Sequence, residues 1–342
     1  MTRVAQSACW AALLLALFGC GGQQVQQTML RPAGPMAARI ENLWWFIFVI
    51  ALVVFVIVFS FFTGAIATRR IRAQVPPDIH PNPVAEQRHI RIVIAATVLT
   101  TLILFAVLGH SVITSKYMNS LVSKNPVSIQ VIGHQWWWEV RYPNPQADLL
   151  VTTANEIHVP IGLPVVLQTS SADVIHSFWA PNLQGKRDLI PGYANAIWFQ
   201  ADKEGVYRGQ CAEFCGHEHA LMAFYVVAES QDKFNAWLEQ QRKPAPDPAN
   251  DVLKHGRDVF TKSTCVMCHT VRGTEAGSHV GPDLTHLASR ISIGAGTLPN
   301  NPGSLGGWIS DPQAIKPGVR MPPNPLPGED LQALVQWLET LK

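Results

Sequence analysis

The chain has 342 residues, of which 48% are hydrophobic and only 15% are charged, and its formal net charge is +2. This length allows two or three domains, and the excess of apolar over charged residues indicates that part of the chain lies in a membrane. A charge this close to neutral, without a basic cluster, excludes the electrostatic footprint of a nucleic-acid-binding protein, so no DNA or RNA partner is expected.

Residues 1–19 are predicted to form an export signal, because Arg3 precedes an apolar stretch that runs from Ala8 to Phe18. The stretch closes with Leu17-Phe18-Gly19-Cys20, which resembles a bacterial lipoprotein box. This resemblance implies cleavage before Cys20 and lipidation of that cysteine. An ordinary signal sequence with an incidental cysteine is the alternative.

Residues 20–115 are predicted to contain a transmembrane hairpin. Helices are expected at about 43–66 and 92–113, since each segment is apolar and long enough to cross about 30 Å of hydrocarbon. Arginines outnumber acidic residues in the connecting loop, which places this loop in the cytoplasm. The chain from Tyr117 onward then lies on the outer face of a bacterial plasma membrane, periplasmic or extracellular, where free thiols oxidise unless a metal or haem holds them.

Residues 117–242 are predicted to form a β-sandwich or barrel followed by a helix at 231–242. Short β-branched and aromatic runs, separated by Pro, Gly and Asn, are typical of such folds. These runs lie at 127–132, 156–160, 164–169, 195–200, 205–209 and 222–228.

Residues 243–250, Lys-Pro-Ala-Pro-Asp-Pro-Ala-Asn, are predicted to form a stiff extended linker, because the prolines prevent a helix. A second domain follows at 251–342, with helices expected near 251–262 and at 329–341 around a Gly/Pro-rich middle. We expect the two domains to meet only through the linker and whatever surface they share.

The segment from Cys211 to Met222 gathers two thiols, an imidazole and a thioether between two predicted strands. Soft sulfur ligands with imidazole suit copper, and the thiolates of Cys211 and Cys215 can bridge two copper ions that would each need one terminal His. His219 supplies one imidazole, and His176, predicted to end an apolar strand just before a turn, is the best candidate for the other. A disulfide and a structural zinc site are the alternatives, but both leave Met222 unexplained.

With the upstream His176-Ser-Phe178, this pattern resembles the dinuclear CuA domain of cytochrome c oxidase subunit II, over about residues 35–230. The resemblance implies a cupredoxin-like Greek-key β-barrel. It also implies that the Glu213 carboxylate helps to bind magnesium at the interface with the catalytic subunit, where the alternative is a solvated loop residue. The copper ligands implied are His176, Cys211, Cys215, His219, Met222 and the backbone carbonyl of Glu213.

Two further segments carry the same resemblance. Gly133-His-Gln-Trp-Trp-Trp138 is similar to the aromatic stretch in which the Trp after Gln, here Trp136, passes electrons inward. His80-Pro-Asn-Pro-Val-Ala-Glu86 is similar to the segment whose Glu, here Glu86, marks a proton-uptake entrance on the cytoplasmic side. Aromatic runs are ordinarily core, so Trp137 and Trp138 are expected to be core residues, and a solvated charge is the alternative for Glu86. Asp188-Leu-Ile-Pro-Gly-Tyr193 departs from the family, which commonly has Arg after Pro-Gly, and puts any role of that Arg in doubt.

Cys265-Val-Met-Cys268-His269 is the signature of c-type haem attachment, in which both thiols form thioethers and the adjacent His ligates the iron. A thioredoxin-like pair or a disulfide is the alternative. A low-spin electron carrier needs a sixth iron ligand, for which we expect Met321, because Met267 lies too close to the attachment site to reach the opposite face.

Residues 251–342 resemble a class I cytochrome c, which implies an all-α domain. In that family the carbonyl of a Pro soon after the haem motif orients the proximal His, and Pro282 matches it. The first and last helices of the family cross through small and aromatic residues. Gly256 and Phe260 are therefore expected to face Leu334 and Trp337.

A hairpin, a CuA domain and a fused cytochrome c together resemble subunit II of a caa-type haem-copper oxidase. The resemblance implies that electrons pass from an external donor, a cytochrome c or an upstream respiratory complex, through haem c to CuA. They then continue to catalytic subunit I, which reduces oxygen to water and pumps protons among further oxidase subunits. No catalytic residue is expected in this chain. A CuA subunit of a nitric-oxide reductase and a membrane-anchored copper carrier are the alternatives, whereas a quinol-oxidase subunit lacks these copper ligands.

Overall fold

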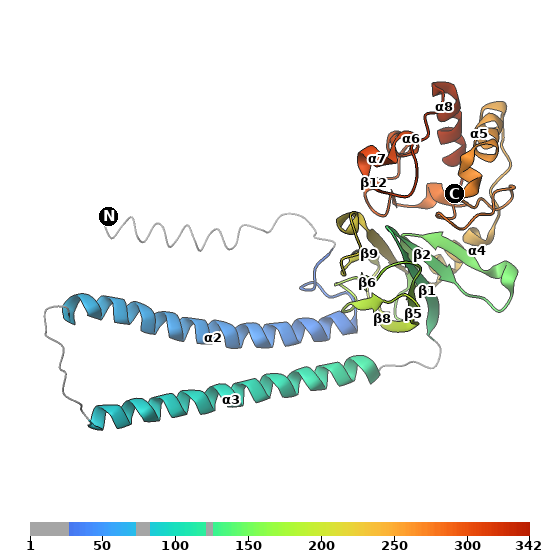
Figure 1. The fold of residues 1–342 in the computed structure, drawn as a ribbon. Coiled ribbons are helices and arrows are strands. Elements are labelled where there is room, and N and C mark those ends of the chain that lie inside the picture. The colour runs from blue at the N-terminus through green and yellow to red at the C-terminus, as the bar shows by residue number, and fades with distance from the viewer. Residues whose placement is uncertain (1–26, 73–82, 121–125) are drawn as a thin grey trace.

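The structure is a computed structural model and describes residues 27–72, 83–120 and 126–342. Figure 1 shows three parts: a pair of long helices, a β domain, and a helical domain seated on the β domain at the side away from the long helices. The predicted export signal and Cys20 lie outside the described residues.

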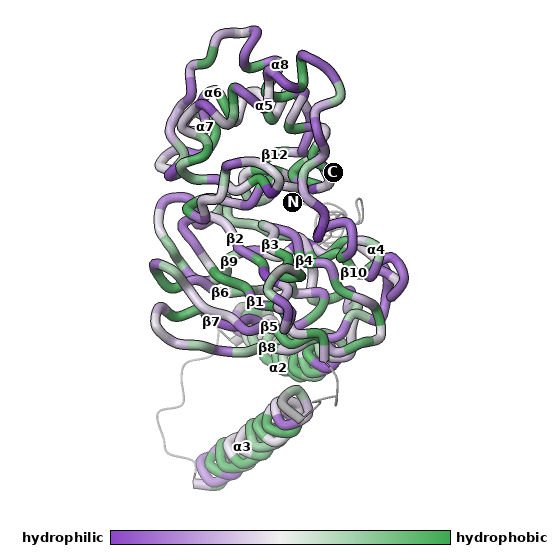
Figure 2. The backbone as a smooth tube through the Cα atoms, turned by 90° about the vertical axis from the view of Figure 1, so that its right-hand side faces the viewer, coloured by the Kyte–Doolittle hydropathy of each residue, from purple (hydrophilic) through white to green (hydrophobic). Residues whose placement is uncertain are grey.

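The two long helices, α2 (Pro35–Arg72) and α3 (Pro83–Ser120), extend beyond the predicted spans at both ends. The apolar stretches predicted the membrane-crossing part, but the helices continue into polar sequence that hydropathy does not mark. Their lengths and composition suffice to cross a membrane. In Figures 1 and 2 the start of α2 and the end of α3 both lie at the β domain.

The segment before α2 packs on the β domain. The Ala33 N–H donates to the Asn182 carbonyl at 2.8 Å, and the Asp202 N–H donates to the Ala33 carbonyl at 2.7 Å. Met36, at the start of α2, is fully buried. The β domain therefore includes residues that the predicted boundary at 117 leaves out.

The β domain consists of two five-stranded sheets with strand orders β3-β2-β1-β5-β8 and β4-β10-β9-β6-β7. The pairs β1/β5 and β4/β10 are parallel and the others antiparallel. The strands are β1 (Val127–His134), β2 (Trp137–Tyr142), β3 (Val151–Ala154), β4 (Glu156–Pro160), β5 (Pro164–Ser171), β6 (His176–Trp179), β7 (Arg187–Leu189), β8 (Asn195–Gln200), β9 (Gly205–Cys211) and β10 (Ala223–Glu229).

Alternating side chains build the core between the two sheets. In β1, Ile129 and Val131 are fully buried while their neighbours are partly exposed, and Val226 and Ala228 repeat this alternation in β10. Because successive side chains of a strand point to opposite faces, each sheet buries one apolar face against the other.

All six predicted strands are present, but β2, β3, β6 and β7 were not predicted. His176 begins β6 instead of ending a strand, so that part of the prediction is wrong. The four-residue β6 is held between β7 and β9, and neighbours distant in sequence therefore define it more than its own composition does.

After α4 (Gln231–Arg242) the chain forms the smaller helical domain, in which the first and last helices cross as predicted. The rings of Phe260 and Trp337 lie 5.3 Å apart, and a Cβ on Gly256 would lie 2.1 Å from the Ala333 carbonyl oxygen, so only glycine fits there. The elements are α5 (Asp251–Lys262), η3 (Thr264–Met267), η4 (Leu287–Ser289), β11 (Ser292–Ile293), β12 (Leu298–Pro299), α6 (Pro302–Ser310), α7 (Pro312–Ile315) and α8 (Gly328–Leu338).

The connection at 243–250 is not helical, as expected, but it is not a free spacer. The Ala245 N–H donates to the Arg272 carbonyl at 2.8 Å. The domains also share hydrogen bonds: the Ala223 N–H donates to the Ala295 carbonyl at 2.9 Å, and the Ile291 N–H donates to a Glu156 carboxylate oxygen. The helical domain is therefore fixed on the β domain (Figure 2).

Candidate copper and haem sites

Two cysteines lie side by side at the end of the β domain that faces the helical domain. Cys211 ends β9, Cys215 lies in the following loop, and their sulfur atoms are 3.7 Å apart. Both thiols are free, so the structure does not contain the disulfide that was the alternative to a metal site. Each thiol is only 3% exposed.

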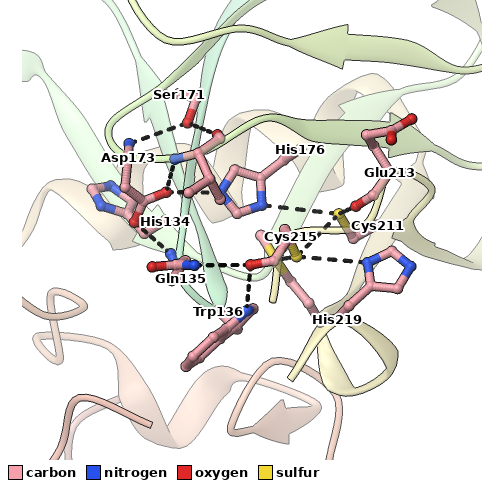
Figure 3. A network of polar contacts seen from close by, with 12 residues as sticks. His134, Gln135, Trp136, Ser171, Asp173, His176, Cys211, Glu213, Cys215 and His219 are labelled. Atoms are coloured by element: carbon pink, nitrogen blue, oxygen red, sulfur yellow. Dashed lines mark hydrogen bonds and ion pairs between the residues drawn. The ribbon is translucent and has the colours of Figure 1, made fainter. Parts of the chain in front are cut away.

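The other predicted copper ligands surround these sulfurs (Figure 3). His176 Nδ1 lies 3.9 Å from Cys211 Sγ, and the Glu213 carbonyl oxygen lies 3.3 Å from the same sulfur. His219 Nδ1 and Met222 Sδ lie 3.6 and 3.8 Å from Cys215 Sγ. The fold therefore assembles two thiols, two imidazoles, a thioether and a carbonyl, which is a donor set suited to copper.

Asp173, which the sequence did not single out, orients His176. The His176 Nε2–H donates to Asp173 Oδ1 at 2.9 Å, which turns Nδ1 toward the sulfurs. The Gln135 and Val174 N–H groups each donate to Asp173 at 2.8 Å. A Cβ on Gly133 would lie 2.7 Å from the His176 ring, so the imidazole can occupy this position only because residue 133 has no side chain. Such support of a ligating imidazole is typical of metal sites.

The environment shifts proton affinities toward a thiolate. The hydrogen bond from the Cys215 thiol lowers the pKa of Cys211 to about 4, and the same contact, with burial, raises the pKa of Cys215. Burial opposes protonation of His176, but its contacts with Cys211 and Asp173 outweigh burial and raise its pKa. Thiolate is the form that binds metal, so the pair is suited to ligation.

Trp136 and Gln135 join this loop to the start of β2. The Trp136 Nε1–H and the Gln135 Nε2–H each donate to the Cys215 carbonyl at 2.9 Å. Trp136 is 7% exposed: it packs in the core of the β domain and also lines a cavity shared with the helical domain. Trp138 is core, as expected, but the same expectation is wrong for Trp137, which is partly exposed and stacks on His134.

Glu213 and Glu86 both place their carboxylates outside the copper cluster. The Glu213 side chain is exposed and points away from the sulfurs, although its carbonyl faces Cys211 (Figure 3). Glu86 is exposed in the first turn of α3. Neither carboxylate is brought together with another predicted site residue.

The helical domain contains a cavity of 390 Å³ that gathers the predicted haem-binding residues. Cys265, Cys268, His269 and Met321 all line it, and His269 Nδ1 lies 2.8 Å from the Pro282 carbonyl oxygen, which is the contact expected. Burial lowers the pKa of His269, which favours the neutral imidazole that an iron ligand requires. Five β-domain residues, which include Trp136 and Trp137, complete the wall.

Buried polar atoms in this cavity fit a haem. Arg290 Nε and Ser292 Oγ are buried and have no hydrogen-bond partner among the described residues, and both residues line the cavity. A haem carries two propionate carboxylates, which would accept from such groups. An unpaired buried donor is costly, and a bound anionic group removes that cost.

Comparison with known proteins matches both domains. The family described as the periplasmic domain of cytochrome c oxidase subunit II matches residues 145–230, and the cytochrome c family matches residues 253–342. A cytochrome c oxidase subunit 2 from Alkalihalophilus pseudofirmus is 38% identical over 341 residues, covering 96% of this chain and 95% of the relative. One from Bacillus subtilis is 28% identical over 357 residues, covering 97% and 96%. The solved periplasmic domain of subunit II from Bradyrhizobium japonicum is 32% identical and covers 36% of this chain and 97% of that chain, with a TM-score of 0.33.

Proposed function

Since the chain belongs to the cytochrome c oxidase subunit II family, we propose that electrons reach its haem c first, pass to CuA, and then leave for the haem-copper subunit. The chain is a subunit of a respiratory terminal oxidase, with copper in its β domain and haem in its cytochrome c domain. Its two apolar helices anchor it in the membrane, with both domains on the outer side. The bound metals supply the one-electron carriers.

The observation that carries the proposed order is the position of Trp136. This residue lines the haem cavity and also donates to the carbonyl of Cys215. One side chain therefore touches both sites. Because Trp136 is buried, a soluble donor cannot contact it directly, whereas electrons held at the haem can reach it.

For the copper ions we propose the ligands that the fold gathers around the two sulfurs. The thiolates would bridge the coppers, the two imidazoles would terminate them, and the Met222 thioether and the Glu213 carbonyl would be weak ligands. Asp173 would hold His176 in its ligating tautomer. The proposed set is His176, Cys211, Cys215, His219, Met222 and the Glu213 carbonyl.

For the haem we propose thioether bonds to Cys265 and Cys268 and iron ligation by His269 and Met321. All four residues line one cavity. The Pro282 carbonyl would orient His269 by accepting a hydrogen bond from the Nδ1–H of that histidine. The Nε–H of Arg290 would donate to a haem propionate.

The roles proposed for Glu213 and Glu86 rest on the resemblance to subunit II and on the exposure of their side chains. The exposed Glu213 carboxylate is available to bind magnesium at a subunit interface, and the exposed Glu86 is available as a proton-uptake entrance. We propose subunit I and further oxidase subunits as partners, and a cytochrome c or an upstream respiratory complex as the donor. The relatives compared are named as oxidase subunits, which favours oxygen over nitric oxide as the final acceptor.

Cofactor content tests the ligand assignment. The purified chain should contain two coppers and one haem that resists extraction by acidic organic solvent. A single copper, or an extractable haem, would contradict the two ligand sets.

Replacement of Trp136 tests the electron path. Trp136→Leu should slow electron transfer from haem c to CuA by roughly 10- to 100-fold, because the side chain that touches both sites is lost. Trp137→Leu is the matched control, since Trp137 lines the same cavity but has no hydrogen bond to the copper loop among the described contacts. Equal rates in the two variants would overturn the path.

A further inference from the structure

Lys316 is a buried lysine at the junction of the two domains. It follows α7 in the helical domain, and its side chain is only 1% exposed. Its Nζ donates to three backbone carbonyls: Trp136 at 2.9 Å, Leu221 at 2.7 Å and Gly294 at 3.1 Å. The first two belong to the β domain and the third to the helical domain, so one ammonium group joins both.

The three contacts satisfy all the hydrogen-bond donors of the Lys316 ammonium group. An ammonium has three N–H donors and no acceptor, and each donor of Lys316 has its own carbonyl. No carboxylate forms a salt bridge with Lys316 among the described residues, so its direct contacts are all with backbone carbonyls, while Glu218 and Cys215 act on it only at longer range. A buried cation that loses such partners is strongly destabilised, which makes the arrangement specific to one domain orientation.

Each carbonyl belongs to a segment of a cofactor site. Trp136 donates from its indole to Cys215, Leu221 precedes Met222, and Gly294 lines the haem cavity. Lys316 itself begins the loop that leads to Met321. The Gln313 Nε2–H donates to the Met321 carbonyl at 2.8 Å and braces this loop.

We propose that Lys316 is a positioning residue that fixes the haem domain on the copper domain, so that haem-to-copper electron transfer occurs in one preformed geometry without a docking step. This proposal rests on the proposed function. Arg320, on the same loop, contacts Gln135 Oε1 at 3.2 Å and Asp173 Oδ2 at 3.3 Å. Its side chain is 63% exposed, and an exposed pair contributes little, so Lys316 is the principal anchor.

The test compares Lys316→Met with Lys254→Met in the whole oxidase complex. Methionine keeps the length of the side chain and removes the charge and the three donors, and Lys254 is an exposed lysine of the same domain. The first measurement is hydrogen exchange at the Ala223 and Ile291 amides, whose hydrogen bonds cross the interface. The second is the haem-to-copper rate after photochemical reduction, measured as a function of solvent viscosity.

We expect Lys316→Met to speed exchange at both amides, to slow electron transfer by roughly 10- to 100-fold and to make the rate depend on viscosity. The haem and copper spectra should not change, and Lys254→Met should match the wild type. Wild-type exchange, or faster exchange with a wild-type rate, would overturn the proposal. If Lys316→Met does not assemble, Lys316→Gln, which keeps an amide donor, gives the same two measurements. Absence of haem-to-copper transfer in the wild type would instead refute the proposed function, while the exchange result would still report on the interface.

Discussion

Arg320 Nη2 lies 3.3 Å from Asp173 Oδ2, and the other oxygen of this carboxylate accepts the Nε2–H of His176 at 2.9 Å. The residue before the proposed iron ligand Met321 is thereby two contacts away from a proposed copper ligand. The haem-ligand loop and the copper site are therefore parts of one hydrogen-bonded unit, although they belong to different domains.

Asp173→Ala should weaken copper binding by roughly 10- to 100-fold, because His176 loses the acceptor that fixes its orientation. Competition with a copper chelator measures the loss. Arg320→Gln is the control, since it touches the same carboxylate from the solvent side and should retain copper. Equal loss in the two variants would mean that Asp173 does not act through His176.

Met222→Leu should keep two coppers and shift their potential, whereas Cys215→Ser should destroy the dinuclear centre. A weak thioether ligand tunes the metal, but a bridging thiolate holds both ions. Copper content and the mixed-valence EPR signal distinguish these outcomes. Loss of copper to the same extent in both variants would refute the division of roles.

Met321→Ala should leave the haem covalently bound and the copper spectrum intact, yet lower the haem potential and slow reduction by an external donor. Attachment depends on the two cysteines, while a Met ligand raises the potential. Redox titration and steady-state turnover measure the two effects. A wild-type potential together with wild-type turnover would show that another residue ligates the iron or that the haem is bypassed.

His158 should contribute stability that depends on pH. Burial opposes its protonation, but the contacts with the carboxylates of Glu156 and Glu229, an ion pair and a hydrogen bond, outweigh burial and raise its pKa above the ordinary value of about 6.5, while Trp237 stacks on the ring. The stabilisation is therefore fully present below about pH 6.5 and is lost as the pH rises through the raised pKa.

Thermal unfolding of wild type and His158→Gln checks this prediction. The variant should be less stable at pH 6 by roughly 1.5–3 kcal/mol, and the difference should shrink as the solution becomes alkaline. His279→Gln, at an exposed position, should show no such trend. A gap between wild type and His158→Gln that widens with pH would reverse the assigned sign.

Local spacing made most of the two ligand sets predictable. Cys211 to Met222 and Cys265 to His269 are short segments whose donors remain neighbours in the fold. The membrane helices were predictable for a similar reason, since hydropathy marks the apolar middle of each. Their ends were not, because a helix can continue into polar sequence.

The contacts that Asp173, Lys316 and the linker make with distant segments could not be predicted. The role of Asp173 depends on the fold, which brings the loop before β6 next to Gln135 and His176. A lysine next to a Pro-Gly turn is ordinarily exposed, and the burial of Lys316 depends on its contacts with the other domain. The same holds for the linker. Its prolines predict an extended chain, but they do not predict that this chain packs on the helical domain.

The burial of Trp136 also decides from which side the copper loop can be reached. Phe214, in this loop, is 75% exposed, whereas Trp136, which donates to the loop, is 7% exposed and lines the haem cavity. A small molecule in solution therefore meets the copper loop at Phe214 and not at Trp136.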